Sequence, residues 1–400
     1  MKAHKELMMK TFTLRNFESM VEVAVSCFTG TSGVEEYHIS LNSLVPAGIE
    51  IQLERIKHAY METIDSYGIG MESSVFRRFF CSDLANQAPV LEERDFSCRF
   101  PAENPCCVSW ICQPPGHTGK VSLWAYHVFD RKKPLEKSMD EGSLILKRGS
   151  LSHVWTQGIT CTRDETSYEQ SRGILDTYSS FLRKYGITLS DDVVRTWFFV
   201  RNIDTNYKGF VTARREYFAA SGLTVHTHFI ASTGVEGSHV DVAARVSMDA
   251  YAVSGLLPGQ VAFLSAPENL SSTYVYGVTF ERGVSVSYRD RKHVILSGTA
   301  SIDGNGSILH KGDVLRQLDR TVENMEALLK KAGAGIGNIV SLTAYVRDLS
   351  DFDLVKDRMR HIFPASPIVT CCASVCRPGW LVEVEGMAII PNFDPGLPLF

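Results

Sequence analysis

The sequence lacks a long apolar run, a strong charge of either sign and the cysteine spacing of a zinc site, and each absence excludes a class of protein. No run reaches the roughly 18 apolar residues that a membrane-spanning helix needs, and the first residues contain no continuous apolar stretch of the kind found in secretion signals. We therefore expect a cytoplasmic protein without a membrane partner. The net charge of −4 and a pI near 6.3 give no electrostatic reason to expect nucleic acid as a partner.

The ten cysteines do not form a recognisable metal or disulfide pattern. A long chain without a secretion signal is expected to keep its thiols reduced, so we predict free cysteines. No C-x-x-C pair occurs, and Cys372 and Cys376, four positions apart, have no histidines at a matching spacing. The sequence therefore predicts neither a metal site nor a cofactor.

What the sequence does contain is one very regular window, residues 293–348. Residues 293–302 are β-branched and apolar, and Asp303 begins a turn rich in glycine and asparagine. Asp313 can cap a helix, Gly333 can end it, and residues 338–346 again read as a strand. Apolar residues follow Asp313 at spacings of three and four, on one helical face: Val314, Leu318, Val322, Met325, Leu329 and Ala332. The window predicts a β-α-β unit whose helix covers one face of a sheet.

The same helix, glycine and strand occur twice more in the chain. If Gly68, Gly186 and Gly333 are equivalent, a polar residue closes each following strand 15, 16 and 15 positions later, namely Asp83, Asn202 and Asp348. A second helix and a final strand are then expected at 351–363 and 381–390 in the third copy and at 210–220 and 239–246 in the second. In the first copy the final strand falls at 120–129, and prolines reduce the second helix. This regularity indicates three copies of one unit.

These observations predict an α+β fold of three tandem units, each a small β-sheet with helices on one face. The expected boundaries are 11–135, 143–255 and 274–393, with linkers at 131–143 and 254–273. The open sheet faces need partners, and three copies can provide them by packing around a pseudo-threefold axis. Such an intrachain pseudo-trimer can be a stable monomer.

The order of elements resembles the Rid (YjgF-like) superfamily, whose chorismate-mutase-like units form trimers with ligand sites between subunits. More specifically, SGTASI (297–302), HKGDVLRQ (310–317) and RTWFFVRNI (195–203) resemble the chorismatase family. That resemblance implies hydrolysis of chorismate to pyruvate and a hydroxybenzoate or a dihydroxycyclohexadiene acid.

Two acids in the last strand are the candidates for this chemistry. Glu383 and Glu385 alternate with valines and so share one strand face. Hydrolysis of an enolpyruvyl ether can begin with protonation of its methylene carbon, which requires an acid that burial keeps protonated near neutral pH. The resemblance places the functional acid at Glu383. We expect Asp241 at the corresponding place in the second copy, with Ala243 matching Glu385, and Ser122 in the first copy.

A dianionic substrate also needs cations, and guanidinium groups bind carboxylates bidentately. Arg377 lies six residues before Glu383, and Arg282 matches an arginine in the chorismatase pattern. Cys376 lies seven residues before Glu383, a spacing similar to that of chorismatases yielding 3-hydroxybenzoate. Tyr276 and Thr299 are candidates for substrate binding from their places in matching motifs. For any arginine the alternative is a surface ion pair, and for Cys376 it is a small core residue.

Two other functions stay open. Rid imine deaminases hold the substrate carboxylate with an arginine about fifteen residues before the strand glutamate, and here Ile368 stands at that place. An imine or enamine hydrolase is therefore disfavoured unless another copy supplies the cation. A non-catalytic protein that binds a small ligand on the Rid scaffold is the second alternative, because fold does not fix function.

Overall fold

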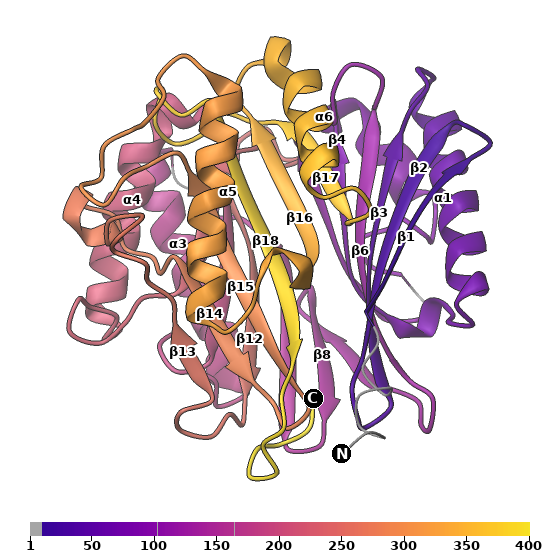
Figure 1. Ribbon diagram of the computed structural model, residues 1–400, viewed down its shortest axis with the longest axis horizontal. Coiled ribbons are helices and arrows are strands. Elements are labelled where there is room, and N and C mark those ends of the chain that lie inside the picture. Colours follow the sequence, from indigo (N-terminus) through magenta and orange to yellow (C-terminus); the bar gives the residue numbers. More distant parts are fainter. Residues whose placement is uncertain (1–9, 102, 164) are drawn as a thin grey trace.

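A computed structural model describes residues 10–101, 103–163 and 165–400, and its strands form three six-stranded mixed sheets (Figure 1). Unit one contains β1 (Lys10–Phe17), β2 (Val21–Thr29), β3 (Val34–Ser43), α1 (Ile49–Ser66), β4 (Ser74–Cys81), α2 (Leu84–Glu92), β5 (Cys107–Cys112) and β6 (Val121–Asp130). Unit two contains β7 (Glu136–Asp140), β8 (Ser143–Arg148), β9 (Leu151–Ile159), α3 (Ser167–Lys184), β10 (Val193–Val200), α4 (Ile203–Ala220), β11 (Ala231–Glu236) and β12 (Val246–Ser254). Unit three contains β13 (Val261–Phe263), β14 (Gly283–Ser287), β15 (Arg291–Ala300), α5 (Val314–Lys331), β16 (Ile339–Val346), α6 (Phe352–Ile362), β17 (Ile368–Cys372) and β18 (Val382–Pro391).

The three sheets share one strand plan. The orders are β1-β2-β3-β6-β4-β5, β7-β8-β9-β12-β10-β11 and β13-β14-β15-β18-β16-β17, each with the unit's last strand in the middle. In each unit the last two strands before the final one pair in parallel, as β16 does with β17, and the other pairs are antiparallel. The predicted α+β fold of three repeated units is confirmed.

Helix α5 of unit three forms for reasons that can be read from its sequence. The Asp313 carboxylate accepts the backbone N–H of Arg316 at 3.0 Å, which satisfies one of the free donors at the start of α5. Leu318, Met325 and Leu329 are buried against the sheet, and Gly333 adopts a φ of +80° just beyond the helix end, where glycine is favoured.

Helices cover the outer face of each sheet, whereas the inner faces pack against one another (Figure 1). One apolar cluster contains buried residues of all three sheets, among them Phe76, Trp197 and Tyr345. At each junction the edge strand of one unit lies beside the next unit: β5 beside β9, β11 beside β15, and β17 beside β3. The contacts close a ring, which is the expected pseudo-trimer within one chain.

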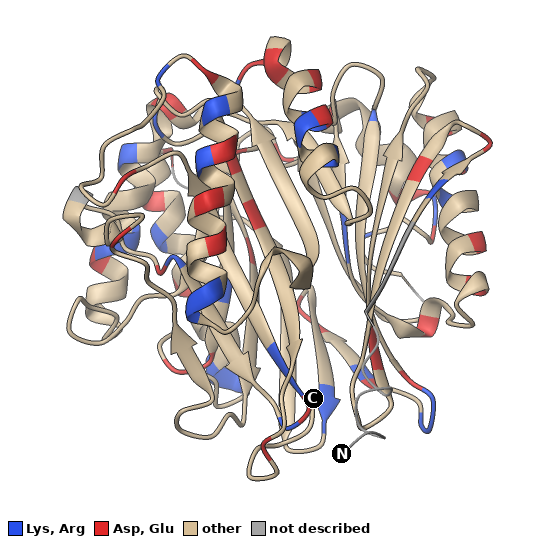
Figure 2. Cartoon of the chain, viewed as in Figure 1, with Lys and Arg blue, Asp and Glu red and all other residues tan. Residues whose placement is uncertain are grey.

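Helix α5, which faces the viewer, carries charges of both signs. Figure 2 shows acidic and basic residues interspersed along α5. No helix in the described ranges is long and apolar enough to cross a membrane. All ten cysteines are free thiols, as predicted.

Two sequence expectations differ from the structure. The final strand of unit two is Val246–Ser254 and not 239–246, because the valines that alternate at 240–242 lie in a loop whose Asp241 side chain accepts the Ala243 N–H at 2.9 Å. The stretches expected to be linkers also contain β7 and β13, which are edge strands of sheets two and three.

Candidate functional site

A cavity between units two and three is lined by three of the six candidate residues, Glu383, Arg282 and Cys376. The space between its walls amounts to about 480 Å³, counted out to the open mouth. Helix α4 and strand β11 of unit two form one wall, and unit three forms the other. The lining residues are Tyr207, Phe210, Arg214, Ser232, Gly234, Phe280, Arg282, Gly298, Ala300, Ile302, Cys376, Trp380 and Glu383.

Glu383 is the acid of this cavity. It lies on β18 between Ala300 of β15 and Tyr345 of β16, and only 5% of it is exposed. Burial raises the pKa of its carboxyl to about 8, with a further contribution from the charge of Glu385, while Arg282 and Arg195 oppose the rise. Glu383 is therefore a carboxylic acid that keeps its proton at neutral pH.

Gly298 makes room for this carboxyl group. It lies where β15 bulges between Leu296 and Thr299, and a Cβ atom added there would stand 1.8 Å from Oε1 of Glu383. Its N–H donates to Oγ1 of Thr233 at 2.8 Å, which ties the bulge to unit two. No larger residue fits without displacing the acid.

Two guanidinium groups from different units line the same cavity. Arg282 is 5% exposed and is held by the Ser271 carbonyl, which accepts from Nε at 3.2 Å and from Nη2 at 2.9 Å. Arg214, on α4, is 2% exposed, lies 4.7 Å from the Phe210 ring centroid and donates from Nη1 to Oγ of Ser232 at 3.4 Å. The cavity thus pairs one protonated acid with two cations.

Arg214 is a site residue that sequence reasoning missed, although a signal exists. Ile203, Tyr207, Phe210, Arg214 and Phe218 follow one another along α4 at spacings of three and four, which defines one helical face. A charged residue in the middle of an otherwise apolar stripe is costly unless it has a partner or a ligand, and this makes it a functional candidate.

Cys376 also lines the cavity as a neutral thiol. Burial, with a smaller contribution from the Glu383 charge, raises its pKa to about 12, while a hydrogen bond with Tyr207 opposes the rise. A thiol that stays protonated at neutral pH is a poor nucleophile. Cys376 therefore serves as a small, weakly polar lining residue beside Glu383.

The other predicted site residues lie around the cavity or outside the described side chains. The Arg377 guanidinium is stacked on the Trp380 ring, 4.9 Å from its centroid, so it lies behind a lining residue. Thr299 is fully buried between two lining residues and donates its hydroxyl to the Ser297 carbonyl at 2.9 Å. Tyr276 ends the short 3₁₀ helix Thr273–Tyr276, and its side chain lies outside the described part of the structure.

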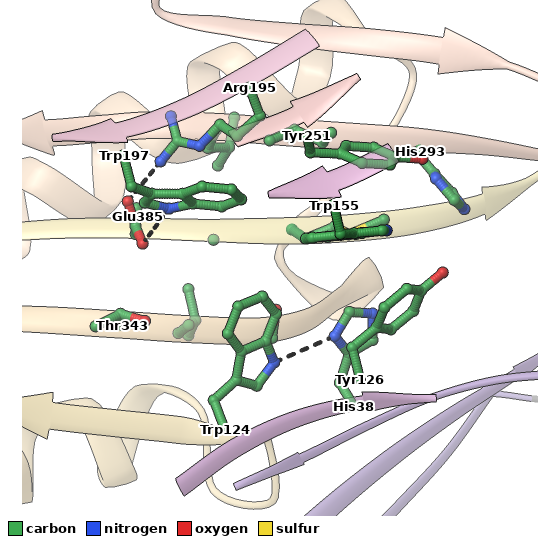
Figure 3. Close-up of a pocket in the computed structure, with 16 residues that line it drawn as sticks. His38, Trp124, Tyr126, Trp155, Arg195, Trp197, Tyr251, His293, Thr343 and Glu385 are labelled. Carbon is green, nitrogen blue, oxygen red and sulfur yellow. Dashed lines mark hydrogen bonds and ion pairs between the residues drawn. The ribbon is translucent and has the colours of Figure 1, made fainter. Parts of the chain in front are cut away.

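Glu385, two residues from Glu383, has a different environment. Its Oε1 accepts from the Trp197 indole at 2.9 Å and its Oε2 from Arg195 (Figure 3). Oε1 also accepts from the Tyr345 hydroxyl at 2.9 Å, and Oε2 from Thr233. Four donors, one of them a buried guanidinium, hold this carboxyl group. Glu385 is therefore a structural group that joins units two and three.

Strand register corrects the expected counterparts of these acids. Tyr345 pairs with Glu383, Phe199 with Ser247, and Phe80 with Ser122, so the residue matching Glu383 in unit two is Ser247 and not Asp241. By the same register, Asp249 matches Glu385, where Ala243 was expected. Asp241 is exposed in a loop. A carboxyl group at the Glu383 position therefore exists in unit three alone among the three units.

The position that carries arginine in Rid deaminases is also placed by register. Ile368 pairs with Leu342 on β16, and Ser232 pairs with Thr196 at the matching place in unit two. The cavity of Glu383, between units two and three, is lined by Ser232 of unit two. Ile368 of unit three lines the corresponding cleft between units three and one. The cation beside this place comes from α4, as Arg214.

Comparisons with known proteins agree with this architecture. The model of the family described as Endoribonuclease L-PSP matches residues 282–390. A RutC family protein of Pyrococcus abyssi is 31% identical over 97 residues, covering 24% of this chain and 76% of that protein. The chain therefore belongs to the RutC family of Rid proteins.

Two further comparisons cover more of the chain. A protein of Streptomyces hygroscopicus named 3-hydroxybenzoate synthase is 25% identical over 248 residues, covering 55% of this chain and 69% of that protein. The crystal structure of a chorismatase superposes with a TM-score of 0.61 at 17% identity, over 79% of this chain and 93% of the other. That structural likeness concerns the fold.

Proposed function

We propose that this protein cleaves the enolpyruvyl ether of chorismate, releasing pyruvate and an aromatic or cyclohexadiene acid. The observation that carries the proposal is the cavity in which a carboxylic acid with a pKa of about 8 faces two buried arginines. Chorismate offers two carboxylates and one acid-labile enol ether, which match these groups in number and in chemistry. The 3-hydroxybenzoate synthase relative supports the same substrate class.

Each residue then has a defined part in the reaction. Glu383 donates its proton to the methylene carbon of the enol ether, and the positive charge that develops at the ether carbon is stabilised by the carboxylate left behind. Arg214 and Arg282 bind the substrate carboxylates and orient the side chain toward the acid. The aromatic walls, Phe210, Phe280 and Trp380, exclude bulk water.

We further propose 3-hydroxybenzoate as the second product. Chorismate contains the atoms of pyruvate and 3-hydroxybenzoate with nothing left over, so this route consumes no net water, whereas a dihydroxycyclohexadiene acid requires one added water. Cys376, a neutral thiol in the wall, supports the aromatic outcome because its spacing from Glu383 is similar to that of chorismatases with this product. Chromatography of the acid product distinguishes the two routes, because the two acids differ in composition by one water.

The decisive test is pyruvate release from chorismate by the purified protein and two matched variants. Glu383→Gln keeps the shape but has no proton to transfer, and we expect turnover to fall by about 10²- to 10⁴-fold with little change in ligand affinity. Glu385→Gln, on the same strand face, removes a structural ion and should lower stability more than turnover per folded molecule. No pyruvate from chorismate, isochorismate or prephenate at high enzyme concentration would instead support the ligand-binding alternative.

A further inference from the structure

A second cavity lies where the three units meet, and the proposed reaction does not use it. All three units line it, and its space amounts to about 590 Å³ counted to the mouth, more than the cavity of Glu383 has by the same measure. Figure 3 shows Trp155, Trp197 and Tyr251 of unit two on one side and Trp124 and Tyr126 of unit one on the other. We call it the axial cavity.

Flat aromatic faces dominate its walls. The Trp155 ring is stacked on Tyr251 with centroids 4.2 Å apart and on Trp197 with centroids 6.3 Å apart. Trp124, across the cavity, is partly exposed although it sits deep between the sheets, and its indole donates to Nδ1 of His38 at 3.4 Å. Aromatic side chains that line one cavity favour a flat ring against them, because stacked aromatic pairs gain energy beyond area burial.

Arg195 adds a specific polar requirement to this cavity. It lines the cavity and is 1% exposed. Its Nη2 donates to Glu385 and Thr233, whereas its Nε and Nη1 have no hydrogen-bond partner among the described residues. Buried donors are almost always satisfied in native proteins, so two free nitrogens on one buried guanidinium indicate an acceptor that is not part of the chain.

The Nε and Nη1 edge of Arg195 is available to such an acceptor. Glu385 contacts Arg195 through Nη2 alone and accepts its other hydrogen bonds from Thr233, Trp197 and Tyr345. A guanidinium group can also bridge two carboxylates through different nitrogens, since it has five N–H donors in a plane. The two oxygens of a second carboxylate can therefore accept from Nε and Nη1 of Arg195.

We propose that the axial cavity binds an aromatic carboxylic acid, with its ring against the indole rings that line the cavity and its carboxylate on Nε and Nη1 of Arg195. A neutral arene would leave the two nitrogens without acceptors, and a saturated acid would lose the stacking on the indole rings. This site is separate from the cavity of Glu383 and does not depend on the reaction proposed there.

The test uses benzoate as a probe, titrated against the full chain by calorimetry and by tryptophan fluorescence. We expect a site that persists in Arg282→Ala and binds benzoate at least tenfold more tightly than benzamide or cyclohexanecarboxylate. Ser341→Leu places a larger side chain on the cavity wall and should weaken benzoate at least tenfold, as should Arg195→Met. Because Arg195→Met leaves Glu385 without its cation and can impair folding, Ser341→Leu with an unchanged circular dichroism spectrum carries the conclusion.

Arg282→Ala separates the two cavities, because Arg282 is proposed to bind carboxylates beside Glu383. It should remove any benzoate bound there and leave the site that Ser341→Leu weakens unchanged. The proposal is overturned if Ser341→Leu binds benzoate as the wild type does, if Arg282→Ala abolishes all benzoate binding, or if benzamide competes equally. A crystal grown with benzoate that shows only ordered water beside Arg195 would overturn it as well. None of these readouts involves chorismate turnover, so a failure here is distinguishable from a failure of the proposed reaction.

Discussion

At the scale of single residues, Glu383 and Glu385 show how two carboxyl groups on one strand face acquire opposite properties. Glu385 accepts four hydrogen bonds, one of them from a guanidinium, so its charge is stabilised in a buried place. Glu383 lacks such a set of donors in the described contacts and is penalised both by burial and by the charge of Glu385. The structural ion thus helps to keep the catalytic acid protonated.

This difference predicts how activity and stability depend on pH. If Glu383 is the acid of the proposed reaction, the rate should hold below about pH 8 and fall as the pH rises through that value. Its carboxyl has a pKa of 4.5 when unperturbed and about 8 in the fold, so its contribution to stability is complete below pH 4.5 and is lost as the pH rises to 8. Over that range the wild type should therefore lose on the order of a few kcal/mol of stability relative to Glu383→Gln, because a tenfold change in an acid constant corresponds to about 1.4 kcal/mol.

Pyruvate release and urea unfolding, each followed from pH 5 to 9 for both proteins, check this prediction. A wild-type rate that stays constant up to pH 9, or a stability difference that does not change with pH, would contradict the raised pKa.

Gly298 gives a second prediction at this scale. The Cβ of Gly298→Ala would overlap Oε1 of Glu383, so the carboxyl group must rotate out of its place over the cavity. We expect turnover to fall at least as far as in Glu383→Gln, with a stability loss of about 1–3 kcal/mol from overpacking. Gly304→Ala serves as a control on the same segment outside the cavity, since a Cβ there would meet the Pro267 carbonyl oxygen at 2.8 Å and should cost stability without a comparable loss of turnover.

The site was predictable from sequence only where local pattern and resemblance agreed. Glu383 stands in an alternating strand and in a family motif, and the structure places it, with Arg282 and Cys376, around one cavity. Arg214 comes from a different unit, so no spacing along the chain relates it to Glu383. Gly298 matters because of a contact with a side chain 85 positions away in the sequence.

At the scale of elements, local sequence determines α5 but not the segment 239–246. Helix α5 has its cap, apolar stripe and terminal glycine in one continuous stretch, so its bounds are readable. Residues 239–246 have the valine alternation of a strand, but the loop they form is held by distant partners: the Ala243 carbonyl accepts from Gln170, and the Val242 carbonyl from Arg201. The real strand, β12, begins only at Val246.

Helix α4 supplies a prediction at this scale through two consecutive arginines. Arg214 faces the cavity and Arg215 is exposed on the other side of the helix. If Arg214 binds a substrate carboxylate, Arg214→Met should raise KM by about 10- to 100-fold, because a hydrogen bond to a charged group is worth about 1.5–3 kcal/mol. Arg215→Met has the same change in helix sequence and charge and should leave KM unchanged. Equal effects of the two substitutions on KM would remove Arg214 from the site.

At the scale of the whole molecule, the three junctions between units are built from different polar groups. Glu385 and Arg195 join units three and two, whereas Arg291 and His293 of unit three both contact Glu36 of unit one, at 2.6 and 2.9 Å. The repeat has therefore kept its fold while its side chains diverged at each junction. The divergence explains why one cleft can hold the acid while the other two carry serine in its place.

The junction of units one and two centres on Asp249, the counterpart of Glu385. Its Oδ2 accepts from Nη2 of Arg78 and from the Ser109 hydroxyl, each at 2.7 Å, and its Oδ1 accepts the Gly158 N–H at 2.7 Å. Arg78 is fully buried and lies over the Trp197 ring, 4.7 Å from its centroid. Among the described contacts of Arg78, Asp249 is the carboxylate that balances its charge.

Asp249→Asn should therefore destabilise the whole chain. Removing one partner of a buried ion pair leaves the other charge without compensation, and the expected loss is about 3–5 kcal/mol in the free energy of unfolding. Because the three sheets share one core, the loss should appear as a shift of a single cooperative transition in urea and not as separate melting of one unit. Asp241→Asn removes the same charge from an exposed loop and should cost less than about 0.5 kcal/mol. Separate transitions, or equal losses in the two variants, would show that the junction does not couple the units.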